Sequence, residues 1–284
     1  MKTALVTGCS SGFGKDIVSG LLAEGWTVIA TMRDSKKREK LLSSELKDHP
    51  GRLHVCELDV TDAAHRRAAA SFVDSLGRLD LLVNNAGLGV MGALEDLSEA
   101  QLRRQFEVNF FGAALLTREL LPALRLARGK VIMVSSILGR QSFPLASAYC
   151  SSKFALEGLS ESLAYELSPH GVQVCLVEPG GFRTRMADNT VWGEKYGDSS
   201  SPYARQNASL RRMREKMLAK PGASCEIVAR RIVALAGMKR MPRRAAVGRD
   251  SVAMIALAAV LPDRAISFLF TRLYDRLLLK EEKA

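Results

Sequence analysis

The chain has 284 residues, of which 47% are apolar and 25% are charged, a balance typical of a folded globular protein and not of a disordered one. The formal net charge is +11, and it is unevenly placed: residues 1–204 carry 23 basic and 23 acidic side chains, whereas residues 205–284 carry 18 and 7. A polyanion or an anionic membrane surface would explain the basic end, and a solvated basic face explains it equally well. Stacking aromatic residues do not interleave these basic side chains, so nucleic-acid binding is not expected.

The cysteines and the longest apolar stretches limit the compartment. Five cysteines occur, an odd number, and no pair has the spacing of metal ligands, so we expect reduced thiols and no metal site. The apolar run that begins at Thr3 breaks at Gly8, which is too short for a signal peptide. Residues 252–261 come nearest to a membrane span and are also too short. We therefore expect a cytoplasmic protein that is either free or attached peripherally to a membrane.

Short apolar runs alternate with longer amphipathic runs in the first two thirds of the chain. The apolar runs predict strands over residues 3–7, 27–31, 53–58, 79–83, 130–134 and 172–177. The amphipathic runs predict helices over residues 14–24, 36–47, 63–75, 99–126 and 148–167. Continuous apolar strands that alternate with helices predict an α/β fold: a doubly wound, Rossmann-like parallel sheet with right-handed crossovers and helices on both faces.

The last third of the chain is less regular. It predicts a polar, mobile loop over residues 193–202, helices over 210–218, 226–238 and 265–280, and a short strand over 245–248. No linker separates two domains, so we expect one domain over residues 1–284. Within it we expect a cofactor and catalytic core (1–190), a substrate loop with helices (191–249), and a basic amphipathic helical extension (250–284).

A glycine-rich turn joins the first strand to the first helix. It reads Thr7-Gly8-Cys9-Ser10-Ser11-Gly12-Phe13-Gly14. Glycines at such a turn let the backbone approach a pyrophosphate, and the helix that follows presents free N–H groups and its positive dipole end to that anion. A glycine cluster alone is weak evidence, but its place between a strand and a helix makes a dinucleotide site the stronger reading over a plain turn.

The end of the second strand indicates which dinucleotide is bound. An NAD site usually carries a carboxylate here for the ribose 2′-hydroxyl. The chain instead has Met32-Arg33, and a guanidinium suits a phosphate. Asp34 could argue for NAD, although an N-cap of the helix near Ser35 explains it equally well. We expect NADP(H).

The third and fourth strands end in residues suited to the rest of the nucleotide. Asp59 is placed to accept from the adenine amino group and Val60 to pack on the ring, although Asp59 could instead cap the next helix. Asn84-Asn85-Ala86-Gly87 offers small residues that leave room for ribose and amides that hold backbone groups. A simple turn is the alternative for that segment.

The fifth strand ends in Ser135-Ser136, and a Tyr149-x-x-x-Lys153 pair follows on a helix. A spacing of four residues places the phenol and the ammonium on one face. A phenol has an ordinary pKa near 10, and a neighbouring cation lowers it and makes the phenol a usable acid/base. Either serine could hold a substrate oxygen near Tyr149. This chemistry suits the alkoxide that forms when a hydride reaches a carbonyl carbon.

Together these motifs resemble the short-chain dehydrogenase/reductase family, over about residues 1–190. The segments 30–34 and 149–158 are similar to the branch that contains 17β-hydroxysteroid and retinol dehydrogenases, many of which use NADP(H). The resemblance implies a catalytic tetrad of Asn109, Ser136, Tyr149 and Lys153, with Ser136 chosen because it lies thirteen positions before the tyrosine. It also implies that Asn109 holds a water in a proton relay and that Lys153 grips the nicotinamide ribose. Family members are commonly dimers or tetramers, so a homo-oligomer is expected.

The resemblance further assigns the carboxamide contact to Pro179, Gly180 and Thr184. The candidate cofactor residues are Gly8, Ser10, Ser11, Gly12, Phe13, Gly14, Arg33, Asp59, Val60, Asn85, Ala86, Gly87, Tyr149, Lys153, Pro179, Gly180 and Thr184. Apolar residues outside the strand ends predict a largely hydrophobic small carbonyl or alcohol substrate, with core packing as the alternative. The candidates are Leu88, Val90, Leu138, Phe143, Met186 and Trp192.

Two further hypotheses follow from the basic end and from the fold. Arg272, Arg276 and Lys280 recur every fourth residue beside an apolar stripe, so the last helix could lie on an anionic membrane or pack on the sheet or a subunit partner. A substrate carried by an acidic protein or by coenzyme A would also use the basic residues. A catalytically silent NADP(H)-binding sensor or scaffold is the alternative to an enzyme, and the complete tetrad argues against it.

Overall fold

The fold is known from a computed structural model that describes residues 1–182, 190–219 and 223–279. Its centre is a seven-stranded sheet in the order β3-β2-β1-β4-β6-β7-β9, in which every pairing is parallel. The strands are β1 (Thr3–Val6), β2 (Thr27–Met32), β3 (Leu53–Glu57), β4 (Leu81–Asn84), β6 (Lys130–Val134), β7 (Gln173–Pro179) and β9 (Arg244–Val247). The order reverses direction between β1 and β4, as in a doubly wound sheet. The predicted Rossmann-like fold is confirmed.

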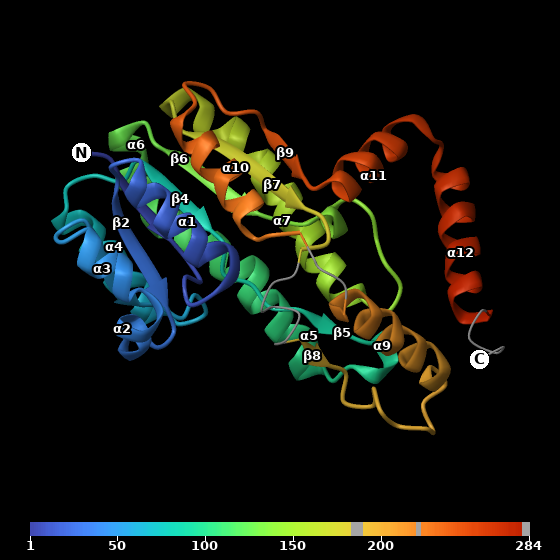
Figure 1. The fold of residues 1–284 in the computed structure, drawn as a ribbon. Coiled ribbons are helices and arrows are strands. Elements are labelled where there is room, and N and C mark those ends of the chain that lie inside the picture. Colours follow the sequence, from blue (N-terminus) through green and yellow to red (C-terminus); the bar gives the residue numbers. More distant parts are fainter. Residues whose placement is uncertain (183–189, 220–222, 280–284) are drawn as a thin grey trace.

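Helices cover both faces of this sheet (Figure 1). One face carries α1 (Gly12–Ala23) and α10 (Glu226–Gly237), which pack on each other and on the first hydrophobic cluster. The other face carries α4 (Ala63–Ser75), α6 (Gly112–Ala127) and α7 (Ser147–Leu167) with the second cluster. Strands buried on both faces must be apolar throughout, which explains the unbroken apolar runs of the sequence.

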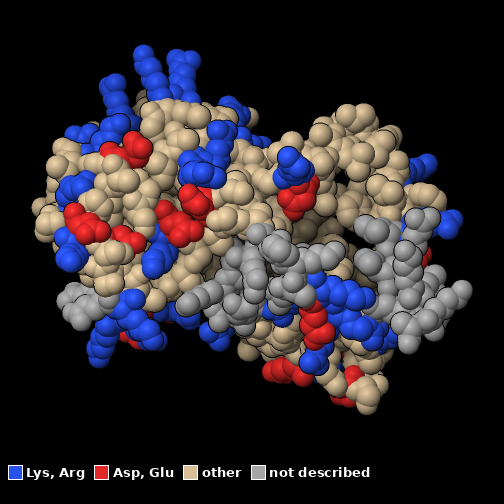
Figure 2. All heavy atoms as spheres, in the orientation of Figure 1, with Lys and Arg blue, Asp and Glu red and all other residues tan. Residues whose placement is uncertain are grey.

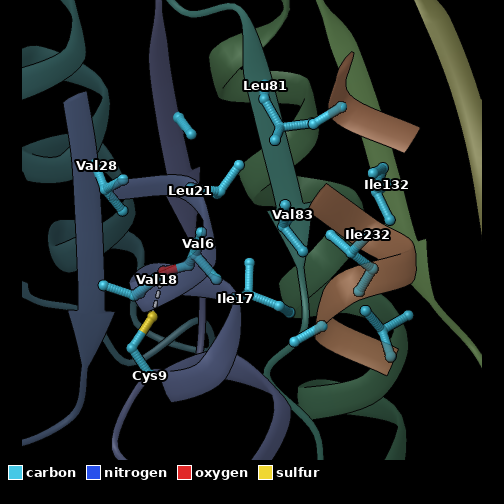
Figure 3. Close-up of a cluster of buried hydrophobic side chains, with 14 of the residues drawn as sticks. Val6, Cys9, Ile17, Val18, Leu21, Val28, Leu81, Val83, Ile132 and Ile232 are labelled. Atoms are coloured by element: carbon cyan, nitrogen blue, oxygen red, sulfur yellow. Dashed lines mark hydrogen bonds between the residues drawn. The ribbon is translucent and has the colours of Figure 1, made fainter. Parts of the chain in front are cut away.

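Figure 3 shows the cluster under α1 and α10. Ile17 and Leu21 of α1 pack among strand side chains such as Val6 and Val83. Ile232 of α10, on the same face of the sheet, belongs to the same cluster. The Cys9 thiol donates to the Val6 carbonyl (3.1 Å), and burial raises its pKa to about 12. This thiol therefore acts as a small core residue.

Two predicted helices are interrupted. The helix expected over 36–47 is split into η1 (Ser35–Lys37), α2 (Arg38–Leu41) and α3 (Ser43–Asp48), because Leu42 leaves helical geometry (φ −131°) and buries its side chain in the core. The helix expected over 99–126 begins with α5 (Glu99–Phe106) and ends as α6, and a π-helical turn, η3 (Glu107–Phe111), joins them. Such π-turns occur most often at functional sites.

A small second sheet lies beyond the carboxyl ends of the main strands. Strand β5 (Val90–Met91) pairs with β8 (Val191–Trp192). Residues 193–202 form turns without helix or strand, and α9 (Ala204–Ala219) begins six residues before the predicted 210. The η2 turn (Leu94–Asp96) anchors this region, because the buried Asp96 carboxylate accepts from Ser201 Oγ (2.6 Å) and Asn207 Nδ2 (2.7 Å).

The chain ends in two helices that stand away from the sheet, α11 (Arg249–Val260) and α12 (Asp263–Leu279) (Figure 1). Helix α11 was not expected, because its apolar residues show no helical period. Several of its large side chains are exposed, Val260 at 81%, and the lobe that it forms is mainly uncharged in Figure 2. No described helix is long and apolar enough to cross a membrane.

Candidate active site

The glycine turn has the backbone geometry that a pyrophosphate site requires. Gly8 and Gly12 have positive φ angles of 71° and 57°, which side chains disfavour. A Cβ on Gly14 would collide with the Gly8 carbonyl and lie 2.7 Å from Asn85 Nδ2. Helix α1 starts at Gly12, and its N-cap Ser11 makes no side-chain cap hydrogen bond. The first N–H groups of α1 therefore remain available to an anion. The turn thus fits the phosphate of a dinucleotide.

Asn85 and Thr7 lock this turn to the end of β4. Asn85 Nδ2 donates to the carbonyl oxygens of Thr7 (2.8 Å) and Gly8 (3.2 Å). In return, the Thr7 hydroxyl accepts from the backbone N–H groups of Asn85 and Ala86 (2.9 Å each). Asn85 thus fixes the backbone of the glycine turn (residues 7–14), called the glycine cradle below. Thr7 was not among the predicted site residues, although its place at the first turn was the available signal.

The end of β2 leaves a guanidinium exposed. The side chain of Arg33 is exposed and makes no hydrogen bond or ion pair with the described residues. Asp34 is otherwise engaged: it forms an ion pair with Lys37 (3.1 Å) and accepts from the Lys36 N–H (3.1 Å). These contacts lower the pKa of Asp34, the hydrogen bond with Lys37 most of all. The Asp34 carboxylate, which would favour NAD if it faced the ribose, is therefore held by residues of η1.

The predicted adenine contacts lie at the end of β3. The Asp59 carboxylate accepts from the N–H (3.0 Å) and the hydroxyl (2.7 Å) of Thr61, whereas the N-cap of α4 is Asp62. Asp59 is therefore not the cap of that helix. Val60 is buried and packs on Gly112 of α6, where a Cβ would have no room.

Tyr149, Ser136 and Lys153 meet at the carboxyl edge of the sheet. Tyr149 and Lys153 lie on successive turns of α7, and both are buried, with 7% and 3% of their surface exposed. Burial raises the pKa of the Tyr149 phenol to about 12, and the hydrogen bond with Ser136 acts in the opposite direction. The phenol is thus protonated near neutrality, and its pKa is shifted in the direction opposite to the one expected from the neighbouring lysine, because the effect of burial is the larger. Lys153 Nζ lies 5.8 Å from the centre of the phenol ring.

The ammonium of Lys153 is held from the strand beside it. Nζ donates to the Val134 carbonyl of β6 (2.9 Å), which leaves two of its three protons for other acceptors. Burial lowers the pKa of Lys153 to about 8, and the negative charge of Glu157 opposes this shift. Lys153 is therefore mostly protonated at neutral pH, but its pKa lies only slightly above that pH.

The two serines at the end of β6 face different surroundings. Ser136 bonds with Tyr149, and its oxygen also accepts from the Leu138 N–H (3.1 Å). Ser135 lies against Glu157 and Gly139 instead, where a Cβ on the glycine would come within 2.8 Å of its oxygen. Ser136 is thus the serine that adjoins the phenol.

Asn109 lies in the π-turn η3 and is 1% exposed. Its Nδ2 donates to the Leu88 carbonyl (3.0 Å) and to Ser152 Oγ (3.2 Å), and its Oδ1 accepts from the Leu88 N–H (2.8 Å). One further hydrogen bond to Oδ1 is possible. Gln105 works beside it, accepting from Val90 N–H (2.6 Å) and donating to the Leu88 carbonyl (2.8 Å). Gln105 was missed by the sequence analysis, although it lies one turn before Asn109.

The last strand end on the cofactor side is tied to α11. The Gly180 N–H donates to the Val247 carbonyl (2.9 Å) and the Gly181 N–H to Asp250 (2.5 Å). The predicted contact Pro179 is buried at the end of β7, and Thr184 lies outside the described residues. Phe13 of the glycine turn packs edge-on against Phe182 (5.8 Å between ring centres).

The predicted substrate residues are partly brought together. Leu88, Leu138 and Phe143 are half-buried on the segments that follow β4 and β6. Val90 is 1% exposed and held by Gln105, so its side chain belongs to the protein interior. Trp192 stacks on Tyr196 (4.1 Å) and lies under the guanidinium of Arg214 (4.9 Å). Met186 lies outside the described residues.

These features define a candidate dinucleotide site beside a buried tyrosine–lysine pair on a Rossmann-like sheet. Within the described ranges no group of three potential metal ligands occurs. A family model for short chain dehydrogenases matches residues 2–195. The chain belongs to the short-chain dehydrogenase family.

Curated relatives support this assignment. The chain is 40% identical to 3-ketodihydrosphingosine reductase of Bacteroides thetaiotaomicron over 203 residues, covering 69% of this chain and 71% of the relative. It is 32% identical to bovine retinol dehydrogenase 8 over 273 residues, covering 93% and 87%. It is 39% identical to human 17-beta-hydroxysteroid dehydrogenase type 1 over 193 residues, covering 66% and 58%. The resemblance read from the motifs is confirmed.

Solved structures agree. A short-chain dehydrogenase from Streptomyces avermitilis matches with a TM-score of 0.78 at 34% identity, with full coverage of both chains. A short chain dehydrogenase from Burkholderia cenocepacia in complex with NADP matches with a TM-score of 0.71 at 27% identity, covering 98% of this chain and 99% of that one. The protein is therefore an oxidoreductase of this family with a nicotinamide dinucleotide as cofactor.

Proposed function

We propose that the protein is an NADP(H)-dependent oxidoreductase that interconverts a ketone or aldehyde and an alcohol on a largely hydrophobic small molecule, with Tyr149 as general acid/base. The observation that carries the proposal is the buried Tyr149 phenol, bonded to Ser136 and one helical turn from the charged Lys153. The glycine cradle lies at the same edge of the sheet, so a hydride donor and a proton donor can reach one substrate carbon and its oxygen.

Each site residue has its own role in the proton transfer. The dinucleotide supplies or accepts the hydride. Ser136 holds the substrate oxygen beside Tyr149, which donates its proton to that oxygen during reduction and takes it back during oxidation. Lys153 stabilises the phenolate that remains. Asn109 fixes the segment at Leu88 that borders the site, and its remaining acceptor position is available to the proton relay.

The preference for NADP(H) rests on the end of β2. Arg33 is exposed and unengaged by the described residues, whereas the neighbouring Asp34 is tied to Lys37. A guanidinium binds a phosphate through paired, charge-assisted hydrogen bonds. The NADP complex of the Burkholderia cenocepacia relative supports the same choice.

A hydrophobic substrate is supported by the apolar side chains around the phenol and by the relatives. The Leu138 N–H donates to Ser136, the Leu88 backbone is bonded to Asn109, and Leu88, Leu138 and Phe143 are each half-buried. The curated relatives carry names that refer to a sphingoid base, a retinoid and a steroid. We propose that the substrate shares with these compounds an extended apolar body.

The proposal is tested by following the nicotinamide absorbance with NADPH and NADH against ketones, aldehydes, retinoids and steroids. Tyr149→Phe should lower kcat by about 100-fold or more, whereas Tyr165→Phe, on the exposed side of the same helix (62% exposed), should leave it unchanged. Arg33→Ala should raise KM for NADPH about tenfold or more and leave KM for NADH unchanged. Tight NADPH binding without turnover of any compound would refute catalysis, and equal loss with both dinucleotides would refute the role of Arg33.

A further inference from the structure

A cluster of charged side chains lies behind the tyrosine–lysine pair. Arg244 of β9 bonds to Glu157 of α7, to Glu178 of β7 (2.6 Å) and to Glu161 of α7 (2.7 Å). The Glu157 and Glu178 side chains are 6% and 2% exposed. Arg140 approaches Glu178 from the η4 turn (Ile137–Gly139) at 3.4 Å. Buried charges of this kind are costly and add little net stability, so the cluster calls for another explanation.

The cluster touches each chain segment that carries the catalytic groups. Glu157 lies four residues after Lys153, on the same face of α7. Ser135, next to the catalytic Ser136, lies against the Glu157 carboxylate. Glu178 is the residue of β7 just before its last residue, Pro179, and its carbonyl accepts from the Ser251 hydroxyl (2.8 Å). The cluster therefore joins the serine turn, the catalytic helix and the cofactor side of the sheet.

The Glu157 carboxylate is confined in one position. A Cβ added to Gly139 would lie 2.8 Å from Ser135 Oγ and 3.0 Å from Glu157 Cγ, so the turn passes directly over the acid. Arg244 bonds one oxygen of the same carboxylate from the opposite side. The glutamate therefore cannot change its position without breaking contacts with the η4 turn and with β9.

The charges that face the pair can be named element by element. Lys153 faces the Val134 carbonyl from β6, and Tyr149 and Glu157 from its own helix. Among these contacts only Glu157 offers a carboxyl group, which opposes the burial of the lysine charge when it is ionised. Its carboxylate opposes the loss of the Lys153 proton, which burial favours.

Glu157 itself depends on its neighbours. Burial, and after it the charge of Glu178, raise the pKa of Glu157, whereas Ser135 and the contacts with Arg244 lower it, and the balance leaves the pKa above its ordinary value. Burial acts against the charge of Arg244, but its bonds with Glu161, Glu157 and Glu178 prevail and raise the Arg244 pKa. The arginine therefore favours the ionised form of Glu157, against the effect of burial.

We propose that Glu157, oriented by Arg244, is a positioning residue whose carboxylate keeps the Lys153 ammonium charged while Tyr149 transfers its proton, an inference that rests on the proposed function of that pair. It acts through the lysine and touches neither substrate nor cofactor.

The test separates charge from shape. Glu157→Gln keeps the size of the side chain and removes its charge, and Glu157→Asp keeps the charge and shortens the side chain. Glu161→Gln is the matched control, because Glu161 binds the same arginine one turn further along α7 but is 55% exposed. Thermal melting and near-UV circular dichroism establish that each variant is folded.

The first readout is the titration of Lys153 in the whole chain without dinucleotide or substrate. Competitive acetylation over a range of pH, with mass spectrometry of the peptide that contains Lys153, gives its apparent pKa. We expect Glu157→Gln to lower that pKa by about one unit, and Glu157→Asp and Glu161→Gln to stay near the wild-type value. An unchanged pKa in Glu157→Gln overturns the proposal. An equal fall in Glu157→Asp also overturns it, and this second variant decides the matter if the first does not fold.

The second readout is the pH dependence of kcat with NADPH. If the Lys153 pKa falls by one unit from about 8, about a tenth of the lysine is protonated at pH 8 where half was before. The Glu157→Gln variant should then lose about fivefold in kcat at pH 8 and little at pH 6. A loss that is equal at both pH values indicates a merely structural role and overturns the proposal. If the wild type turns over no substrate, the proposed function fails, while the acetylation result still decides whether Glu157 controls the charge of Lys153.

Discussion

Gly14→Ala should damage the nucleotide cradle and the stability of the sheet together. The new Cβ would overlap the Gly8 carbonyl and lie 2.7 Å from Asn85 Nδ2, the atom that donates to the Thr7 and Gly8 carbonyls. Either the amide moves and two hydrogen bonds worth about 1 kcal/mol each are lost, or α1 shifts against the first core cluster at about 1–3 kcal/mol. We expect the free energy of unfolding to fall by about 1–3 kcal/mol and the affinity for NADPH to fall at least tenfold.

Urea denaturation followed by circular dichroism measures the first quantity, and quenching of protein fluorescence by NADPH measures the second. Gly158→Ala is the matched control, because a Cβ on Gly158 meets no atom within 4 Å on the exposed side of α7. It should stabilise the protein by about 0.5–1 kcal/mol, the usual gain of alanine over glycine in a helix. A Gly14→Ala protein that unfolds at the wild-type urea concentration and binds NADPH normally would show that the turn yields freely, contrary to the packing described.

Three further predictions concern other parts of the molecule. Thr7→Val removes the oxygen that accepts from two backbone N–H groups, so urea denaturation should show a loss of about 1–3 kcal/mol; a loss below 0.5 kcal/mol would contradict it. Because burial lowers the Lys153 pKa to about 8 from its ordinary value of 10.5, the unfolded chain binds more protons between these values. The buried lysine therefore lowers the free energy of unfolding most below pH 8. The variant Lys153→Met should be more stable than wild type there, and this difference should shrink by about 3 kcal/mol as the pH approaches 10. A difference that stays constant with pH would refute this. Finally, the last helix either packs within the protein or lies on an anionic membrane; in the second case removal of residues 264–284 should reduce co-sedimentation with phosphatidylserine vesicles, and equal pelleting of both forms would exclude it.

The sequence predicts the sheet well because its strands are buried on both faces and leave unbroken apolar runs. The edge strand β9 is short, yet its run of small apolar residues was sufficient. The glycine turn and the Tyr149–Lys153 pair are local in sequence, so their spacing alone places them at the carboxyl edge. The predicted assignments that depend on local order are therefore the ones that the fold reproduces.

The features that sequence reasoning missed depend on contacts between distant segments. The break at Leu42 follows from a place in the core that the local pattern does not encode. The π-turn at Asn109 inserts one extra residue per turn into an otherwise regular helical pattern. Gln105 looks like any polar helix residue until the fold brings Leu88 beside it, and Arg244 lies 87 positions from Glu157.

The isolated parallel bridge between Phe182 and Ala223 gives the chain an exchangeable part. The polypeptide leaves the sheet after β7 and returns to the same point before α10, so the whole excursion between the two bridge residues is closed at its base. All strands of the main sheet lie outside this excursion, so changes in its length or composition need not alter the strand order. The family model ends at residue 195, inside this excursion. We infer that replacement of this one segment changes the substrate that such an enzyme accepts while the sheet beneath it is kept.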